Sequence, residues 1–277
     1  MRFSGSDLDY LIATAKEAAA SEILPRFHAI AAADISVKDR SIDVVTEADT
    51  RAEALIKKQL AAKFPGALIV GEESYEADKS IMDGLAEADL AFVIDPVDGT
   101  MNFIDGLAMF GTIIAVVAKG ETIAGVLHDP VQKQQLLAVK GSGAFQRSAD
   151  GAEVRAKTLP AAPISEMKGL FSWSFFPEPL RTEMPGRFSK FRHGLSTNCS
   201  VFDYWLLAMG KYHVMGNAAG QLWDHLAGVL IHQEAGGYVV RFGGSPYDAT
   251  CRGGNVLCAP DKDSWDAVMR EVVEPPR

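Results

Sequence analysis

The segment from Val93 to Phe103 constrains this chain more than any other part of its sequence. An apolar run, residues 90–94, has the length and composition of a buried strand and leads directly into Asp95. Pro96 and an Asp-Gly pair follow, and these residues are typical of turns. The segment taken alone is therefore equally compatible with a plain turn and with a ligand site at the end of a strand.

Two other kinds of acidic loop do not fit this spacing. A calcium loop needs acids at its third and fifth positions, but counting from Asp95 places Val97 and Gly99 there. Covalent phosphatases carry an acid two residues after the nucleophilic aspartate, whereas Asp98 comes three residues after Asp95. The spacing favours a shared metal ligand set over a covalent mechanism.

A turn at Pro96 can direct the Asp95 carboxylate, the Val97 carbonyl and the Asp98 carboxylate toward one point. Ligand sets made only of oxygen select Mg²⁺ or Mn²⁺ over softer ions. A helix that begins near Gly99 would also place free N–H groups beside the metal, where they can hold a phosphate.

Two more acidic segments are candidates to converge on this turn. Gly71 to Ser74 contains two glutamates and follows a strand-like run, residues 67–70. Trp223 to Gly228 opens a helical pattern with Asp224. Each has a simpler interpretation, since the first is compatible with a solvated acidic loop and the second with a helix cap.

Helical and strand-like patterns alternate along the whole chain, which predicts a layered α/β fold with mixed sheets. The helix over 47–64 opens with Thr46 and Asp49 in the spacing of a capping box, and Pro25 is expected to divide the helix over 6–32. Further helices are predicted over 199–209, 224–235 and 261–272. Strands are predicted over 67–70, 90–94, 212–215 and 237–242, with an antiparallel meander over 110–145, and only weak strand signals occur over 147–187.

Composition bounds the function. With 48% apolar and 23% charged residues the chain is expected to fold, and its net charge of −9 argues against binding to a nucleic-acid backbone. Three unevenly spaced cysteines predict no disulfide scaffold, and the longest aliphatic run, 113–118, is far too short to span a membrane. The N-terminus lacks a signal-peptide pattern, so we expect a cytoplasmic protein.

No other catalytic motif competes with the acidic turn. The sequence contains no H-E-x-x-H metal site, no G-x-S-x-G elbow and no phosphate-binding P-loop. Phe171, Trp173 and Phe175 alternate as in a strand, and with Phe176 they are expected in the core or at a dimer surface. Gly243-Gly244 and Gly253-Gly254 are expected to be turns.

Four blocks together resemble the inositol monophosphatase family: Asp43 to Asp49, Gly71 to Glu73, Asp95 to Phe103, and Trp223 to Gly228. The resemblance covers nearly the whole chain. It implies one domain over 1–277 with a five-layer αβαβα sandwich, an N-terminal lobe of about 1–147 and a C-terminal lobe of about 148–277. It also implies a homodimer that hydrolyses phosphate monoesters with Mg²⁺ and is inhibited by Li⁺.

The resemblance also implies a ligand set. Glu72, Asp95 and the Val97 carbonyl would hold one metal, whereas Asp95, Asp98 and Asp224 would hold a second. Glu72 would support a third and weaker ion, so two or three Mg²⁺ ions are expected, with Mn²⁺ as a substitute. The neighbouring Glu73 receives no firm role.

By the same resemblance, Asp49 and Thr100 orient and deprotonate the attacking water, and Glu72 belongs to the catalytic group. A metal lowers the pKa of bound water, and Asp49 can accept a proton through the Thr100 hydroxyl. Asp49 is equally compatible with a role as the helix cap alone. Lys38 matches a family lysine near the metal site, although a solvated lysine is the simpler interpretation.

The chain departs from the inositol-specific pattern on the substrate side. Asn217 replaces a glutamate that holds a sugar hydroxyl, and Asn198-Cys199-Ser200 replaces Gly-Thr-Ala. An uncharged Asn both donates and accepts hydrogen bonds, so a different alcohol or an anionic leaving group should be tolerated. The substrate-binding residues implied are Asp98, Gly99, Thr100, Asn198, Cys199, Ser200, Asn217 and Asp224.

The favoured function is a Mg²⁺-dependent phosphomonoesterase that uses metal-activated water on a small polyol or sugar phosphate resembling inositol 1-phosphate. Fructose-1,6-bisphosphatase, histidinol-phosphate phosphatase and 3′-phosphoadenosine-5′-phosphate phosphatase activities of the same superfamily remain open. A non-catalytic, metal- and phosphate-binding regulatory protein is the alternative of a different class.

Overall fold

The computed structural model of the chain describes residues 3–29, 35–37 and 44–274. The helices in these ranges are α1 (Gly5–Ala18), α2 (Glu47–Lys63), α3 (Glu72–Ala77), α4 (Thr100–Ile104), α5 (Leu180–Arg187), α6 (Ser200–Ala208), α7 (Leu222–Glu234) and α8 (Lys262–Val268). The strands are β1 (Ile35–Val37), β2 (Val44–Thr46), β3 (Leu68–Gly71), β4 (Ala91–Asp98), β5 (Gly111–Ala118), β6 (Glu121–Asp129), β7 (Gln134–Val139), β8 (Ala144–Arg147), β9 (Glu153–Arg155), β10 (Lys168–Phe171), β11 (His193–Leu195), β12 (Val214–Gly220), β13 (Tyr238–Val240) and β14 (Gly254–Ala259). Mixed sheets and alternating helices confirm the predicted α/β class.

The larger sheet contains the predicted meander. Within the described ranges its strands follow chain order from β3 to β9, and only β3 and β4 are parallel. Short turns connect the antiparallel strands, such as the one at Lys119-Gly120, where both residues have positive φ. Because β4 is buried at every position, its sequence is a nearly continuous apolar run up to Asp95.

The smaller sheet has the order β11-β10-β12-β14-β13 and is also mixed. β10 is parallel to β11 and β12, whereas β14 is antiparallel to β12 and β13. Two of these strands, β11 and β14, have no counterpart among the predicted elements, and β10 lies in the segment over 147–187, where only weak strand signals occur. β11 has only three residues, so its periodicity is too brief to predict a strand.

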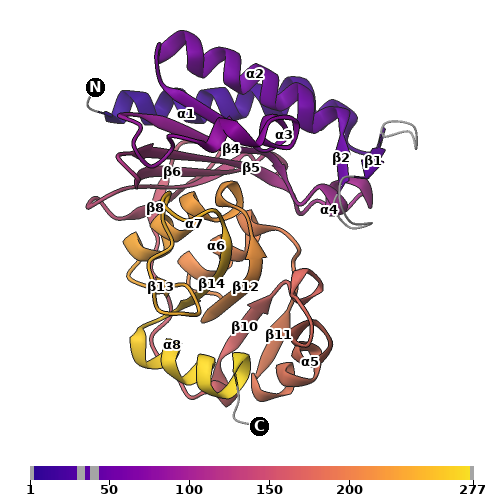
Figure 1. The fold of residues 1–277 in the computed structure, drawn as a ribbon, viewed down its shortest axis with the longest axis vertical. Helices are drawn as coiled ribbons and strands as arrows, with labels where there is room; N and C mark the ends of the chain where they lie inside the picture. The colour runs from indigo at the N-terminus through magenta and orange to yellow at the C-terminus, as the bar shows by residue number, and fades with distance from the viewer. Residues whose placement is uncertain (1–2, 30–34, 38–43, 275–277) are drawn as a thin grey trace.

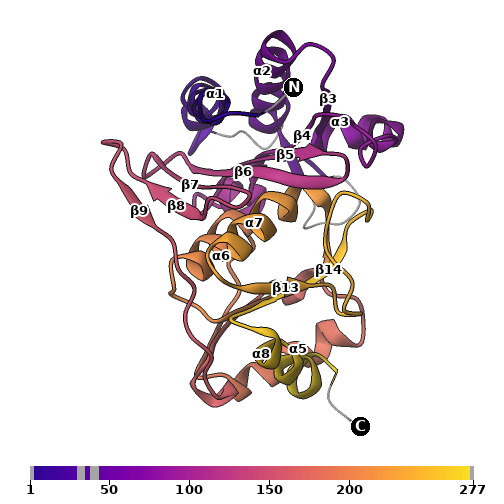
Figure 2. The same ribbon diagram turned by 90° about the vertical axis from the view of Figure 1, so that its left-hand side faces the viewer.

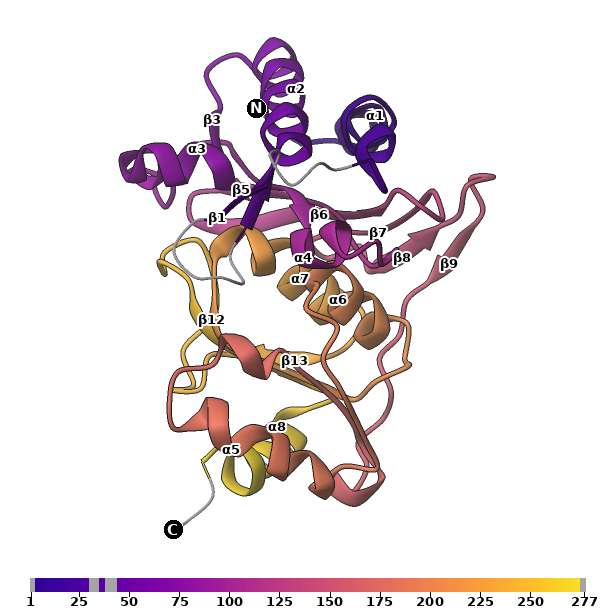
Figure 3. The ribbon, with the colours of Figure 1, turned by 90° about the vertical axis from the view of Figure 1, so that its right-hand side faces the viewer.

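The elements stack in five layers, as the resemblance implied (Figures 1, 2 and 3). α1 and α2 cover one face of the larger sheet, α6 and α7 lie between the two sheets, and α5 and α8 cover the outer face of the smaller sheet. Successive β4 side chains point to opposite faces of the larger sheet and pack in different hydrophobic clusters. Phe92 packs beneath α1 and α2, and Val93 packs toward α7. In the described part of the chain, no helix is both long and apolar enough to cross a membrane.

Two sequence predictions need correction. The first helix continues as a π-helical turn, Ala19–Ile23, and a 3₁₀ turn, Leu24–Arg26, in which Pro25 has no N–H to donate. It ends at Phe27, where the backbone is extended. The second prediction was that Phe171, Trp173 and Phe175 alternate along one strand. Strand β10 instead ends at Phe171, and Trp173–Phe175 forms a 3₁₀ turn. Phe171 and Phe176 belong to one buried cluster and Trp173 packs against it, which confirms the core placement for these three residues but not for Phe175.

Candidate metal centre

The strand does not end before a turn at Pro96 as predicted, because β4 continues to Asp98 with a β-bulge between Asp95 and Asp98. This bulge brings Asp95 and Asp98 to the same face of the larger sheet. In a regular strand two residues three apart point to opposite faces. Here Asp95 pairs with Ile113 and Asp98 with Gly111, so β4 carries one more residue than β5 between these pairs. Asp95 shares the face of Val93, which packs toward α7, and the extra residue returns Asp98 to that face.

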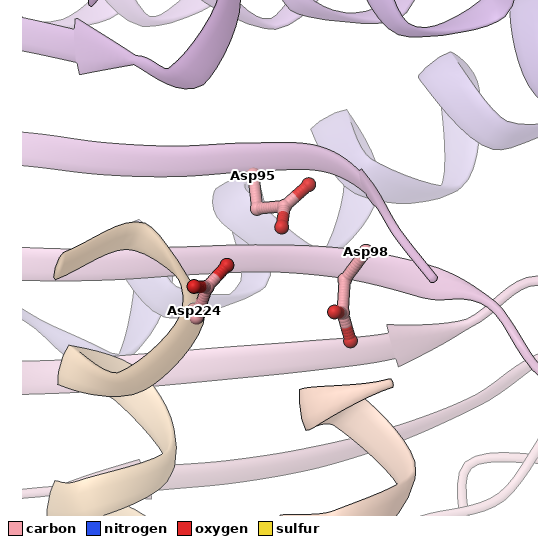
Figure 4. Close-up of side chains that lie close together, drawn as sticks. All are labelled: Asp95, Asp98 and Asp224. Carbon is pink, nitrogen blue, oxygen red and sulfur yellow. The ribbon is translucent and has the colours of Figure 1, made fainter. Parts of the chain in front are cut away.

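Helix α7 supplies the third acid of the centre. Asp224 occupies its first turn, three residues after Gln221, and accepts a hydrogen bond from the Gln221 N–H at 2.8 Å. Figure 4 shows Asp95 and Asp98 on β4 with Asp224 facing them from α7. One carboxylate oxygen from each of these residues lies within 4.8 Å of the others.

The electrostatics of this cluster favour a bound cation. Burial, followed by the charges of Glu72, Asp98, Asp224 and Asp49, raises the pKa of the Asp95 carboxyl well above its usual range. All four neighbouring charges are negative, so a divalent cation would convert mutual repulsion into attraction. A donor set of hard carboxylate oxygens suits Mg²⁺ or Mn²⁺.

Glu72 reaches this cluster from the neighbouring strand. It is the first residue of α3, immediately after β3, and it is half-buried. The parallel register pairs Gly71 with Ile94. Glu72 and Asp95 are the residues that directly follow this pair in the two segments. The effect of the Glu72 charge on Asp95 agrees with this placement.

Helix α4 starts at the predicted position. Gly99 precedes its first residue with φ +84°, a left-handed conformation that favours glycine, and a Cβ there would lie 2.8 Å from the Met109 carbonyl oxygen. The first N–H groups of α4 therefore follow the bulge directly, beside Asp98. A phosphate seat at these N–H groups stays a prediction.

Asp49 has contacts that fit both roles considered for it, the helix cap and the proton acceptor. Its Oδ2 accepts hydrogen bonds from the Thr46 N–H at 2.9 Å and the Thr46 hydroxyl at 2.6 Å, which confirms the capping interaction. Its Oδ1 lies 3.2 Å from the Thr100 hydroxyl, which also has the Val97 carbonyl oxygen within 2.9 Å. A hydroxyl has one proton, so Thr100 donates to one of these oxygens at a time.

The start of α6 holds the Asp98 carboxylate. The N–H groups of Ser200 and Val201 donate to it at 3.1 and 2.6 Å, and the Cys199 thiol lies 3.0 Å from Oδ2. Burial raises the pKa of Asp98, and these donors oppose the increase. Cys199 is only 2% exposed, and burial together with the Asp98 charge raises its pKa, so the thiol is a neutral donor.

Of the remaining residues with predicted roles, Asn198 directly precedes Cys199, Asn217 lies on β12, and Lys38 lies outside the described ranges. Asn198 is exposed with φ +51°, and its side chain accepts a hydrogen bond from the Ser196 hydroxyl at 2.9 Å. Asn217 is half-buried in β12, where a register shift begins. Lys38 and Asp43 lie outside the residues that the structure describes.

Asn102 is a site residue to which the sequence reasoning assigned no role. It lies in the quoted block, and its side-chain amide donates to the Met109 carbonyl at 2.8 Å and to the Thr197 carbonyl at 2.9 Å. The Thr197 hydroxyl in turn donates to Asp203 at 2.6 Å. Asn102 thus joins α4 to the segment that holds Asp98, and only its position beside the acidic turn could have suggested this.

Comparisons with known proteins agree with this geometry. A family model described as the inositol monophosphatase family matches residues 6–275. The chain is 32% identical over 231 residues to Nus factor SuhB of Haemophilus influenzae, covering 79% of each protein. It is 30% identical over 233 residues to fructose-1,6-bisphosphatase/inositol-1-monophosphatase of Thermotoga maritima, covering 84% of each. Among solved structures, a Thermotoga maritima IMPase superposes with a TM-score of 0.79 at 25% identity, covering 97% of both chains.

Proposed function

Because this chain belongs to the inositol monophosphatase family, we propose that it is a Mg²⁺-dependent phosphomonoesterase that acts on a small polyol or sugar phosphate. The observation that carries the proposal is the meeting of Asp95, Asp98 and Asp224 from two distant parts of the chain. The start of α4 and the Asp49–Thr100 contact lie against the same bulge.

The proposed ligands are all oxygen donors: Glu72, Asp95, the Val97 carbonyl, Asp98 and Asp224. Asp95 is central, since the charges of the other carboxylates all act on it. Bound Mg²⁺ would supply positive charge for the phosphate oxygens and lower the pKa of water. We propose two or three ions, with Mn²⁺ as a substitute and Li⁺ as an inhibitor.

Asp49 is proposed as the proton acceptor. Thr46 holds Asp49 Oδ2 with two hydrogen bonds, which leaves Oδ1 directed at the Thr100 hydroxyl. When Thr100 donates to Asp49, its oxygen can accept a proton from a water molecule placed for attack. General-base help of this kind contributes roughly 10²–10⁴ in rate.

The substrate side is proposed from the elements that border the bulge. Gly99 precedes α4 and Thr100 is its first residue, and both would contact the phosphate, together with Asp98 and Asp224. Asn198, Cys199, Ser200 and Asn217 would face or shape the alcohol. Cys199 would act by holding Asp98, since its side chain is buried.

The alternative of another class is a non-catalytic metal- and phosphate-binding protein. One relative, from Haemophilus influenzae, carries the name Nus factor SuhB. Such a protein would keep the acidic cluster for binding. The Asp49–Thr100 contact favours catalysis, because binding alone requires no proton acceptor at that position.

A phosphate-release panel tests the proposal. Inositol 1-phosphate, fructose 1,6-bisphosphate, histidinol phosphate and 3′-phosphoadenosine 5′-phosphate are each supplied with Mg²⁺ or with EDTA. We expect Mg²⁺-dependent release from at least one ester and near-complete loss of it in Asp224→Asn. Mg²⁺ binding without turnover on any ester would favour the non-catalytic alternative.

A homodimer in the cytoplasm is proposed on family resemblance alone. Light scattering on the purified protein should give twice the mass of one chain. A single-chain mass at micromolar concentration would contradict the dimer without affecting the proposed reaction.

A further inference from the structure

Glu53 is a buried carboxylate that none of the motifs explains. It lies on α2, it is only 3% exposed, and it binds the start of α3. Its Oε2 accepts a hydrogen bond from the Glu73 N–H at 2.7 Å, and its Oε1 accepts one from the Ser74 N–H at 3.0 Å. The Ser74 hydroxyl also donates to Glu53. A carboxylate so deeply buried requires such donors, because leaving it unsatisfied would be very costly.

These contacts replace a local helix cap. The residue before α3 is Gly71, which has no side chain to accept from the first N–H groups. Glu53 supplies the missing acceptor from 20 residues upstream. The carboxylate approaches the backbone so closely that a methyl group on Gly71 would overlap it. Gly71 therefore allows Glu53 to bind the turn between β3 and α3.

This turn sets the position of Glu72. Glu72 lies between Gly71, which is paired with Ile94 in β4, and Glu73, whose N–H Glu53 holds. Both sides of Glu72 are thus restrained, one by the sheet and the other by α2. Figure 2 shows α3 following β3 at the edge of the larger sheet, next to β4. When the backbone of a metal-binding residue is already restrained, less conformational entropy is lost as its side chain binds the ion.

We propose that Glu53 is a positioning residue of the metal centre, which holds the Gly71–Ser74 turn so that Glu72 faces Asp95. The inference rests on the proposed metal-binding function. Lys57 supports the arrangement, with its Nζ 3.8 Å from Glu53 Oε1 and a hydrogen bond to the Ser74 hydroxyl. Groups that orient metal ligands without touching the metal typically change metal affinity or activity 10- to 100-fold when mutated.

Glu53→Gln tests the proposal with little change of shape. The glutamine amide has one acceptor oxygen, so its NH₂ group would face one of the two backbone donors. Glu47→Gln is the matched control, because Glu47 is on the same helix, is 49% exposed and pairs only with Arg51 and Arg26 among the ion pairs described. Mg²⁺ affinity is measured by titration calorimetry on the metal-free full chain, and phosphate release is measured against Mg²⁺ concentration.

We expect Glu53→Gln to weaken Mg²⁺ binding on the order of 10- to 100-fold. Its kcat at saturating Mg²⁺ should stay within a few-fold of the parent, and Glu47→Gln should match the parent in both. If Glu53→Gln fails to fold, Gly71→Ala applies the same test, because the added methyl displaces the Glu53 carboxylate.

Three results would overturn the inference. Parent-like Mg²⁺ affinity in a folded but less stable Glu53→Gln or Gly71→Ala protein would reduce Glu53 to a helix cap. A parent protein that binds no Mg²⁺ would overturn this inference and the proposed function together. Loss of affinity in Glu47→Gln as well would show that the charge of α2, and not the turn, governs binding.

Discussion

Asp95→Asn separates the charge of the acidic cluster from its shape. The asparagine side chain has nearly the same size, and its oxygen can still accept from the Val97 N–H, which now donates to Asp95 at 3.1 Å. The substitution removes one negative charge from a site where burial and four neighbouring carboxylates disfavour ionisation. It also removes the acid shared by both proposed ligand groups.

The magnitude follows from ligand linkage. Mg²⁺ at 100 times its dissociation constant stabilises a protein by about 2.7 kcal/mol. For a domain of this size 1 kcal/mol corresponds to roughly 2–4 °C in Tm, so the parent should gain on the order of 5–10 °C. Asp95→Asn should gain almost nothing at the same concentration. In EDTA it should melt at or above the parent temperature, because the repulsion is reduced.

Thermal melts in EDTA and in Mg²⁺ provide the assay, with Asp89→Asn as the control. Asp89 lies just before β4 with its side chain 84% exposed, so its replacement changes the net charge equally and leaves the cluster intact. A full Mg²⁺-dependent gain in Asp95→Asn would refute the assignment of the cation to this cluster. A lower Tm in EDTA would refute the argument from repulsion.

Three further predictions test other parts of the structure. Asp49→Asn should lower kcat by roughly 10²–10⁴ with little loss of Mg²⁺ affinity, and a kcat within a few-fold of the parent would leave Asp49 as a cap only. Gly228→Ala should destabilise the protein by about 1–3 kcal/mol in urea unfolding, because the new methyl would overlap the buried Tyr204 ring, whereas an exposed helical glycine would show a gain. His232 is buried, which lowers its pKa to about 4, so the folded state keeps it neutral while the unfolded chain takes up a proton below about pH 6.5. Stability is therefore lost as the pH falls from 6.5 toward 4, and His232→Gln should lose about 2 kcal/mol less than the parent between pH 7 and pH 5.

The periodic parts of the fold could be predicted from short windows of sequence. The helix over 47–64 corresponds to α2, and the meander over 110–145 corresponds to β5 through β8. The capping residues Thr46 and Asp49 also interact as their spacing predicted. These features depend on contacts within a few residues, so local patterns are sufficient to predict them. The short strand β11 was missed and β10 has only weak signals, because both pair with strands distant in sequence.

The sequence by itself determined which side chains are available for chemistry: acids at the ends of apolar runs, an Asp-Gly turn and a helix that opens with Asp224. Only the tertiary structure decided that they meet. Asp95 and Asp98 share a face because pairing with β5 accommodates an extra residue in β4, and no spacing rule within β4 predicts that pairing. Glu53 reaches the start of α3 for the same reason, since its partners lie 20 residues away and become neighbours only when α2 packs on the sheet.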